Sequence, residues 1–384
     1  MDNLNKLMMQ AEKYFSALPG ERISFAADLP EAFRKFSPEK TAVFSGTHYA
    51  QTVRDAGFEV WNGIIESEPD TGCVEAMAEY LRNRKCDRVL AVGGGSVLDA
   101  AKAALLMAET GWTLDELFGV NKWSSANAGK SLRRMTAIPT TSGTGSEATP
   151  YSNIVVREAG VKRLIVETES IPEEAVMIPA LTFSMPELLT RAVGCDALAH
   201  LIEGFINVGA DGNHPPVNEW ARCGIALAVA ALPAAMKNIP EARKAMVYAA
   251  LLGGMTIRYK STGLPHLCSF SWFGKIAHGD AVAILLPECW RYYLANPAVR
   301  DRTMQLNTVF PGSSPEEVIA SYEDFLDLIG MPGGLSAWPG INAALIEKTA
   351  RSGAQNRMKL ELAPHPVPLD ESCDILTAIL KLSL

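Results

Sequence analysis

Three consecutive glycines between an apolar segment and a helical pattern constrain this chain more than any other feature. Residues 89–92 are short, apolar and β-branched at both ends, which is typical of a strand covered on both faces. Gly93, Gly94 and Gly95 follow, so the backbone can turn sharply and approach a ligand without interference from Cβ atoms. A helical pattern over residues 96–107 then predicts a helix that begins at this turn.

The start of that helix is a candidate phosphate site. Ser96 is placed to cap the helix, and Asp99 lies where the carboxylate of a capping box is expected. The N–H groups at a helix start and the positive end of its dipole attract phosphate. Lys102 either adds charge to this site or is an ordinary solvated lysine. Because the run is neither the G-x-G-x-x-G fingerprint nor a P-loop, it leaves a nucleotide site and a structural turn equally open.

Length and composition favour a soluble enzyme with two domains. A chain of 384 residues exceeds one ordinary core, and 48% hydrophobic with 20% charged residues is typical of a globular protein. The formal net charge of −8 argues against a nucleic acid partner, which requires concentrated Lys and Arg. We expect no signal peptide and no membrane span. The seven cysteines are scattered without CxxC spacing, which favours a reduced, cytoplasmic location.

The first part of the chain alternates strand and helix patterns, which predicts a parallel, doubly wound sheet with ligands at the carboxyl ends of its strands. Strands are expected at residues 22–25, 41–44, 58–61, 89–92 and 135–138, and helices at 48–56 and 72–84. After about residue 182, long helical patterns take over at 186–208, 216–237, 240–260, 279–293, 315–329, 341–353 and 369–381. We therefore expect an α/β dinucleotide-binding domain over residues 1–182 and a helical domain over 183–384, with the function in the cleft between them.

A second polar loop follows the strand expected at 135–138. Residues 139–147 contain five hydroxyl side chains and two glycines, and the hydroxyl groups include Thr140, Thr141, Thr144 and Ser146. Alone, this loop is either a plain polar turn or a set of small hydrogen-bond donors for a phosphate or ribose. Two such loops at two strand ends of one sheet favour the nucleotide site. A hairpin is expected beyond the loop, over 153–156 and 163–166, with Lys162 near its turn.

Four residues in the second half form a candidate metal site. Asp196 and His200 are spaced i and i+4, so they lie on one face of a predicted helix, as in helices that supply two metal ligands. Taken alone, a surface Asp–His pair is the more frequent explanation. The chain has only six histidines, however, and His266 and His278 fall within one short segment. One carboxylate and three imidazoles suit a divalent metal such as Fe(II), Zn(II) or Mn(II), among which the sequence does not choose.

Taken together, these motifs strongly resemble those of the iron-containing (group III) alcohol dehydrogenase family. The resemblance covers roughly residues 20–384 and rests on Gly93-Gly94-Gly95-Ser96 with Asp99 and Lys102, on residues 139–147 and 194–200, and on His278-Gly279. It implies a Rossmann-like α/β domain followed by an all-α metal-binding domain. It also implies that the metal ligands are Asp196, His200, His266 and His278, with Fe(II) the expected metal ahead of Zn(II).

The resemblance further implies the cofactor site and the reaction. The expected cofactor contacts are Ser45, Gly46, Gly93, Gly94, Gly95, Ser96, Asp99, Lys102, Thr140, Thr141, Thr144, Ser146 and Lys162. The implied reaction is hydride transfer between nicotinamide C4 of NADP or NAD and a small primary alcohol or aldehyde bound to the metal. A homodimer is the expected assembly.

Three features depart from the family pattern. Phe270 occupies the place where the family commonly has a second histidine near the nicotinamide. The interval from His266 to His278 is two residues shorter than expected, and its side chains Cys268, Phe270 and Trp272 are the expected lining of the substrate pocket. Gly46 stands where NAD-preferring members often carry an aspartate, whose carboxylate would repel a 2′-phosphate. We therefore expect NADPH to be used at least as well as NADH.

Two alternative functions remain open from the sequence. One is an enzyme like glycerol dehydrogenase or dehydroquinate synthase, and the other is a nucleotide-binding protein of this fold without turnover. The phosphate-bearing substrate of a dehydroquinate synthase requires basic residues near the metal, for which Arg191, Lys260 and Lys275 are the candidates. The same three residues leave open an aldehyde with an acidic tail. The four candidate metal ligands argue against a protein without turnover, whereas Phe270 weakly favours it.

Overall fold

The computed structural model describes residues 2–15, 22–65, 68–214 and 216–384, which divide into two units. The α/β unit is Glu12–Met185, and the helical unit is Pro186–Leu384 together with Met1–Ala11. The first eleven residues thus differ from the predicted division, which placed them in the α/β domain. A contact within the helical unit accounts for this, because the Cys223 thiol lies 3.6 Å from the carbonyl oxygen of Leu7, to which it donates.

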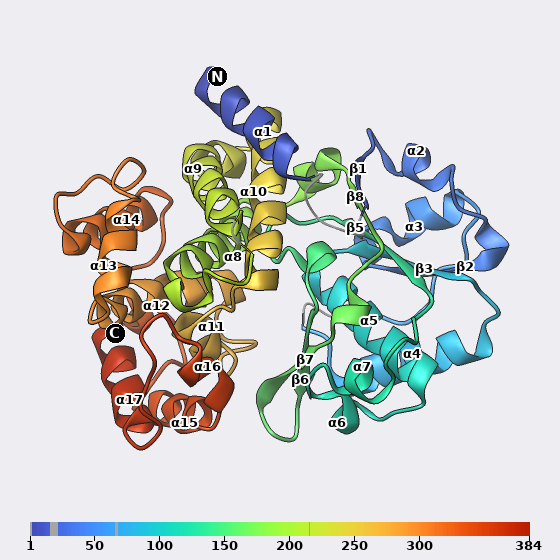
Figure 1. Ribbon diagram of the computed structural model, residues 1–384. Coiled ribbons are helices and arrows are strands. Elements are labelled where there is room, and N and C mark those ends of the chain that lie inside the picture. The colour runs from blue at the N-terminus through green and yellow to red at the C-terminus, as the bar shows by residue number, and fades with distance from the viewer. Residues whose placement is uncertain (1, 16–21, 66–67, 215) are drawn as a thin grey trace. The chain divides into compact units, whose positions relative to one another are not determined.

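The α/β unit is built on a five-stranded sheet in the order β1-β8-β5-β3-β2, in which all neighbouring strands are parallel (Figure 1). Its strands are β1 (Arg22–Phe25), β2 (Thr41–Ser45), β3 (Arg88–Gly93), β5 (Arg134–Pro139) and β8 (Glu174–Met177). Alternate residues of β3 enter two different cores: Val89 and Ala91 on one face, Leu90 and Val92 on the other. Apolar side chains on both faces are what a parallel sheet covered by helices on both sides requires.

Four predicted strands are confirmed as β1, β2, β3 and β5. The strand predicted at 58–61 is wrong, because this segment pairs with the sheet only through a single bridge between Val60 and Val43. Strand β8 was not predicted. A second, three-stranded sheet has the order β4-β7-β6. In it, β6 (Tyr151–Val156) and β7 (Val161–Val166) form the predicted antiparallel hairpin, and β4 (Gly119–Val120) pairs with β7 in parallel.

Short and medium helices connect the strands of the α/β unit. They are α2 (Leu29–Phe33), α3 (Thr47–Asp55), α4 (Thr71–Asn83), α5 (Gly95–Thr110), α6 (Leu114–Leu117) and α7 (Lys122–Ala126). The longest, α5, follows the three glycines as predicted and is buried along most of its length. It packs against α4 and β3, which places its first turn beside the end of the strand that precedes it.

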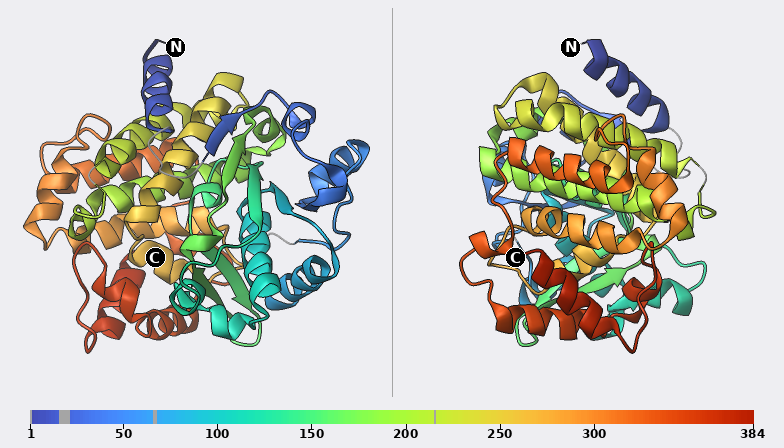
Figure 2. Two further views of the ribbon diagram at one scale, coloured as in Figure 1. Left: turned by 45° about the vertical axis from the view of Figure 1, so that its right-hand side comes forward. Right: turned by 90° about the vertical axis from the view of Figure 1, so that its left-hand side faces the viewer.

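The helical unit contains the long helices that the sequence predicts. It begins with part of α1 (Asp2–Phe15) and continues as α8 (Glu187–Ile206), α9 (Val217–Met236), α10 (Pro240–Tyr259), α11 (Leu264–Ser269), α12 (His278–Tyr293), α13 (Pro297–Met304), α14 (Pro315–Leu328), α15 (Ala343–Gly353), α16 (Arg357–Glu361) and α17 (Ser372–Leu382). The short helices α11, α13 and α16 were not predicted. Helix α8 packs against α9, α10 and α12, and Figure 2 shows these helices lying alongside one another. Glycines permit this close packing, because a Cβ on Gly194 would lie 2.4 Å from the Leu232 side chain.

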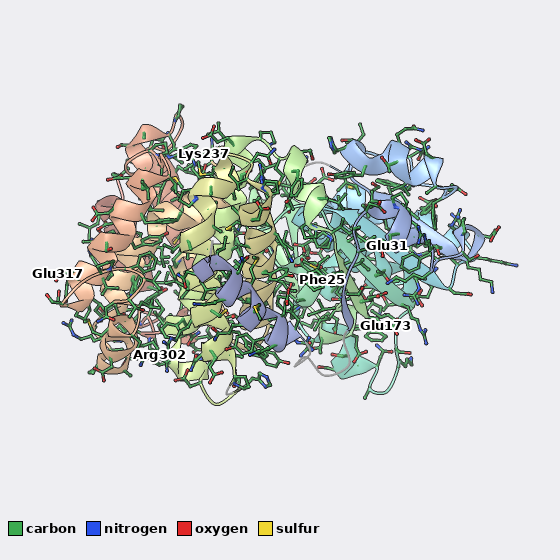
Figure 3. All side chains as sticks on the ribbon, turned by 90° about the horizontal axis from the view of Figure 1, so that it is seen from above. Phe25, Glu31, Glu173, Lys237, Arg302 and Glu317 are labelled. Atoms are coloured by element: carbon green, nitrogen blue, oxygen red, sulfur yellow. The ribbon has the colours of Figure 1, made fainter. Side chains whose placement is uncertain are left out.

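Helix α9 is the one helix among the described residues that is long and apolar enough to cross a membrane. More than half of its apolar window, 56%, is nevertheless buried inside the helical unit, where it packs against α8 and α10. The helix ends at Met236 and is followed by the exposed Lys237 (Figure 3). These contacts are those of a core helix.

Candidate active site

Three of the segments predicted to bind the cofactor lie at one edge of the sheet, where β2, β3 and β5 end side by side. Strand register places Ser45 beside Val92 and Gly93 beside Pro139. The Gly46 N–H donates to the carbonyl of Val92 at 3.0 Å, and the Thr140 N–H donates to that of Gly93 at 3.0 Å. Residues 93–95, which we call the glycine turn, and residues 139–147, which we call the hydroxyl loop, are therefore neighbours at the carboxyl edge of the sheet, as parallel topology predicts.

The hydroxyl loop lies directly on the glycine turn. A Cβ on Gly95 would lie 2.4 Å from the methyl group of Thr144, and one on Gly94 would lie 3.2 Å from the Thr141 side chain. A residue larger than glycine at position 94 or 95 would therefore force the glycine turn and the hydroxyl loop apart. Because Thr141 and Thr144 are only half-buried, their hydroxyl groups are available where the turn begins helix α5.

The capping predicted for helix α5 is wrong. The N-cap is Gly94, so the helix begins before Ser96 and no side chain of the described residues caps it. Asp99 is used elsewhere: its carboxylate accepts hydrogen bonds from Ser146 Oγ at 2.5 Å and from the Asn153 N–H at 2.9 Å. An uncapped helix start is a favourable place for an anionic ligand.

Lys102 is fully buried, and its ammonium group is hydrogen-bonded within the α/β unit. Its ammonium donates to the carbonyl oxygens of Ser146 at 3.1 Å and Thr149 at 3.2 Å, and also to that of Tyr151. Burial lowers the pKa of this lysine, while the nearby Asp99 carboxylate opposes the shift. Lys102 therefore fixes the chain that follows the hydroxyl loop.

Two other predicted contacts are engaged with their own neighbours. Lys162 Nζ lies 2.6 Å from the Glu68 carboxylate, which balances its charge. Ser45 Oγ donates to the carbonyl of Gly46 at 3.0 Å. At Gly46 itself φ is −60°, and an added Cβ would lie 3.8 Å from Val97, its nearest contact. A side chain would fit there, so space alone does not exclude an acidic residue at this position.

Helices α8, α11 and α12 bring the four predicted metal ligands together. From Asp196 Oδ1, the Nε2 atoms of His200, His266 and His278 lie at 3.6, 3.4 and 3.6 Å. Ligand atoms held about 2.1 Å from one ion in a tetrahedral arrangement lie about 3.4 Å apart, which is close to these three separations. The ligand atoms of Asp196, His200 and His266 also all lie within 4.8 Å of one another, a group that does not include His278. The His278 side chain is 26% exposed, whereas the other three are buried, so the site is most open beside His278.

Unsatisfied polar atoms support the same interpretation. Asp196 Oδ1 and His266 Nε2 are buried, and neither has a hydrogen-bond partner in the part of the chain that the structure describes. Such atoms destabilise a protein unless a ligand satisfies them. One carboxylate oxygen and three imidazole nitrogens form a donor set for a divalent first-row metal. The residues present therefore fit the predicted metal.

The ligands also affect one another's ionisation. Burial raises the pKa of Asp196, but the charges of the three neighbouring imidazoles outweigh it and the net shift is downward. Burial lowers the pKa of His200 to about 4. For His266, burial also lowers the pKa, but the charge of Glu203 outweighs that effect and raises it to about 9.

A close helix contact holds α12 against α8 at the metal ligands. A Cβ on Gly279 would lie only 1.8 Å from the carbonyl oxygen of Ala192, so only glycine permits this approach. A buried ion pair lies beside it, in which Arg191 Nη2 and Nε donate to the two carboxylate oxygens of Asp280 at 3.0 and 3.3 Å. Arg191 also donates to the carbonyl of Gly330 at 2.7 Å. Its charge is therefore neutralised within the helical unit.

The residues predicted to line the substrate pocket are mostly core residues. Cys268 and Trp272 are each 1% exposed, and Trp272 Nε1 donates to Thr349 Oγ1 on α15 at 2.8 Å. Burial raises the pKa of the Cys268 thiol to about 12, which leaves it unreactive. Phe270 is also buried, at 9% exposed. Their role toward a substrate stays a prediction.

The sequence left one functional candidate unassigned. Glu203 lies seven residues after Asp196 on α8, and its carboxylate contacts Nδ1 of His266. The spacing of Asp196, His200 and Glu203 along one face of residues 192–206, which are otherwise apolar, was the signal that could have identified it.

Comparison with known proteins decides the family. Residues 27–179 match the iron-containing alcohol dehydrogenase family model, and residues 190–380 match the model of the C-terminal domain of the Fe-containing alcohol dehydrogenase family. The chain belongs to the iron-containing alcohol dehydrogenase family. It is an oxidoreductase of the alcohol dehydrogenase type, with the metal-dependent alcohol dehydrogenase or aldehyde reductase activity of that family. The predicted Rossmann-like and all-α parts are confirmed.

Individual relatives agree with this assignment. Alcohol dehydrogenase 4 of Saccharomyces cerevisiae is 31% identical over 276 residues, which is 70% of each chain. An archaeal alcohol dehydrogenase from a Red Sea brine pool shares the fold, with a TM-score of 0.82 and 22% identity over 96% of this chain and 98% of that one. Sulfoacetaldehyde reductase from Bifidobacterium kashiwanohense, solved with NAD+, has a TM-score of 0.76 and 25% identity over 95% and 97%.

Proposed function

We propose that this enzyme interconverts a small, uncharged primary alcohol and its aldehyde, with one Fe(II) held by Asp196, His200, His266 and His278. The observation that carries this proposal is that Asp196 Oδ1 lies 3.4 to 3.6 Å from the Nε2 atoms of His200, His266 and His278, while Asp196 Oδ1 and His266 Nε2 are buried and unsatisfied. We also propose that it accepts NADPH and NADH, acts in the cytoplasm and is a homodimer, as the family resemblance suggests.

A divalent metal bound by these ligands supplies positive charge that polarises the carbon–oxygen bond of the substrate. The protein's own groups position the reactants. The uncapped start of α5 and the Thr141 and Thr144 hydroxyl groups bind the cofactor phosphates. The exposed side of His278 is where the substrate oxygen approaches. Phe270 carries no exchangeable proton, so the proton of the alcohol leaves by a route other than this side chain.

The ion pairs of the helical unit support an uncharged substrate. Arg191 is paired with Asp280, and Lys260 is buried and lies 2.5 Å from Asp211. Of the three basic residues considered for an acidic substrate, only Lys275 is exposed. A dehydroquinate synthase or a reductase of an anionic aldehyde requires more cationic groups at its site than this.

Gly46 supports the use of NADPH. A carboxylate at the end of β2 would repel a 2′-phosphate, and none is present at this position. Helix α3 begins at Thr47 without a side-chain cap among the described residues, so the helix start adds favourable potential for a phosphate.

The test is aldehyde-dependent oxidation of NADPH and NADH by protein stripped of metal and reloaded with Fe(II) or Zn(II). We expect turnover only after reloading, with uncharged aldehydes reduced faster than sulfoacetaldehyde. Absence of turnover despite bound metal and nucleotide would favour a binding protein without activity. A preference of tenfold or more for NADH in kcat/KM would contradict the cofactor proposal, and light scattering after gel filtration tests the dimer.

A further inference from the structure

Both carboxylate oxygens of Glu203 contact groups that position His266. It lies on α8, one turn after His200, and is 1% exposed. Its Oε1 atom is 2.5 Å from His266 Nδ1, and its Oε2 atom accepts a hydrogen bond from the Gly263 N–H at 2.6 Å. Gly263 directly precedes α11, the short helix that carries His266. One side chain therefore contacts both the ligand and the start of its helix.

The contact with Nδ1 determines which nitrogen of His266 is available to a metal. A histidine that binds a metal must be neutral, and an ionised carboxylate only accepts hydrogen bonds, so the one proton of metal-bound His266 must lie on Nδ1. The lone pair then lies on Nε2, the buried atom that is 3.4 Å from Asp196 Oδ1 and has no hydrogen-bond partner in the described residues. We propose that Glu203 is a positioning residue of the metal site, which holds His266 in the tautomer and orientation that coordinate the metal.

The described contacts of the other two histidines are of a different kind. Ser269 Oγ donates to the carbonyl of His266 at 2.8 Å and lies 3.1 Å from His278 Nδ1, from which it can accept. A neutral hydroxyl group is a weaker partner than a carboxylate. For His200, Nδ1 is buried without a hydrogen-bond partner among the residues described. Of these described contacts with a histidine Nδ1 atom, the one from Glu203 is made by a carboxylate and the one from Ser269 by a hydroxyl group.

A control variant distinguishes positioning of His266 from a purely structural role of Glu203. The start of α11 is anchored a second time, because the Leu264 N–H donates to the hydroxyl oxygen of Tyr293 at 2.7 Å. Tyr293 is buried, and among the described residues its hydroxyl group is bonded to the Leu264 N–H and not to one of the four predicted metal ligands. A Tyr293→Phe variant removes one anchor of α11 and leaves the Glu203–His266 contact in place. It is the matched control for loss of Glu203.

This inference rests on the proposed metal site, so the experiment measures metal binding rather than turnover. Zn(II) affinity is measured by competition with a chelator, and the visible spectrum of the Co(II)-loaded protein reports coordination geometry. In Glu203→Gln the side chain keeps its size, but its amide NH2 group cannot accept the second hydrogen bond. We expect its Zn(II) affinity to fall by about 10- to 100-fold and its Co(II) spectrum to change. Tyr293→Phe is expected to lose stability but to keep both properties.

The outcomes separate the possible failures. If the wild-type protein binds no stoichiometric metal, the proposed function fails. If it binds metal and Glu203→Gln binds equally well with the same Co(II) spectrum, only the role of Glu203 is overturned. Should Glu203→Gln not fold, 15N NMR of histidine-labelled, Zn(II)-loaded wild-type protein decides the question. The inference requires a protonated Nδ1 on His266 and is refuted by metal on that atom.

Discussion

Replacement of Gly279 by alanine tests how tightly the metal site depends on one helix contact. The added Cβ would lie 1.8 Å from the carbonyl oxygen of Ala192, whereas real Cβ contacts are essentially never below 3.0 Å. Helix α12 must therefore move by about 1.2 Å or more for ordinary contact to be restored. Because the clash is with a backbone atom, no side-chain rotation can relieve it.

This movement is large compared with what a metal site tolerates. His278 is the first residue of α12, so it moves with the helix, and metal–ligand distances must stay within about 0.2 Å of their ideal values. We expect Zn(II) affinity to fall by at least roughly 100-fold, the upper range for loss of an outer-sphere partner. Overpacking should lower the free energy of unfolding by about 1 to 3 kcal/mol.

The sign of the stability change makes the assay decisive. Helix propensity alone predicts that alanine stabilises a helix by about 1 kcal/mol relative to glycine, so destabilisation identifies the clash. Zn(II) affinity by chelator competition and the urea unfolding midpoint are measured together. The control is Gly333→Ala in the same unit, where no described atom lies within 4 Å of the new Cβ. Wild-type metal affinity and an unchanged or higher midpoint in Gly279→Ala would refute the reasoning.

Three further predictions concern the α/β unit. The side chain of Gly46→Asp fits the available space. Its charge should lower kcat/KM for NADPH at least tenfold and change kcat/KM for NADH little. An equal effect on both cofactors would contradict this prediction. Lys102→Met leaves carbonyl groups without a donor, so the cofactor-free protein should unfold at lower urea. Unchanged stability with weaker NADPH binding in a fluorescence titration would instead indicate a direct phosphate contact. Burial raises the pKa of Glu147 to about 7 from 4.5, so the folded state keeps this proton to higher pH than the unfolded chain. The free energy of unfolding should therefore fall by roughly 3 kcal/mol as the pH rises from about 4.5 to about 7. Glu147→Gln should remove that fall, and a variant with the same pH profile as the wild type would show that Glu147 does not cause it.

Features determined by local spacing could be predicted from the sequence. The strand, glycine turn and helix over residues 89–107 follow from an apolar run, three residues without side chains and a helical repeat. Asp196 and His200 share a helix face because they are four residues apart. The structure places Nε2 of His266 and His278 at 3.4 and 3.6 Å from Asp196 Oδ1, and their binding of a metal stays a prediction.

Features determined by contacts with distant residues could not be predicted from the sequence. The apolar residues 58–61 have a strand pattern, but strand formation depends on pairing along their length, and the sheet contacts them at Val60 alone. Lys102 near a helix start has the same sequence context whether it faces a ligand or the core, and the carbonyl groups that it bonds are 44 to 49 residues away. Glu203 contacts His266 across 63 residues.

The assignment of residues 1–11 to the helical unit has a consequence for folding during synthesis. The Leu7 carbonyl and the Cys223 thiol are 216 residues apart in the chain. At the usual translation rate, roughly 10 to 40 s pass between the appearance of these two residues at the ribosome. An isolated helix of the length of α1, 14 residues, is only marginally stable in water during this interval. Docking of the first helix is therefore a late event, and the α/β unit has time to fold before the helical unit can be completed.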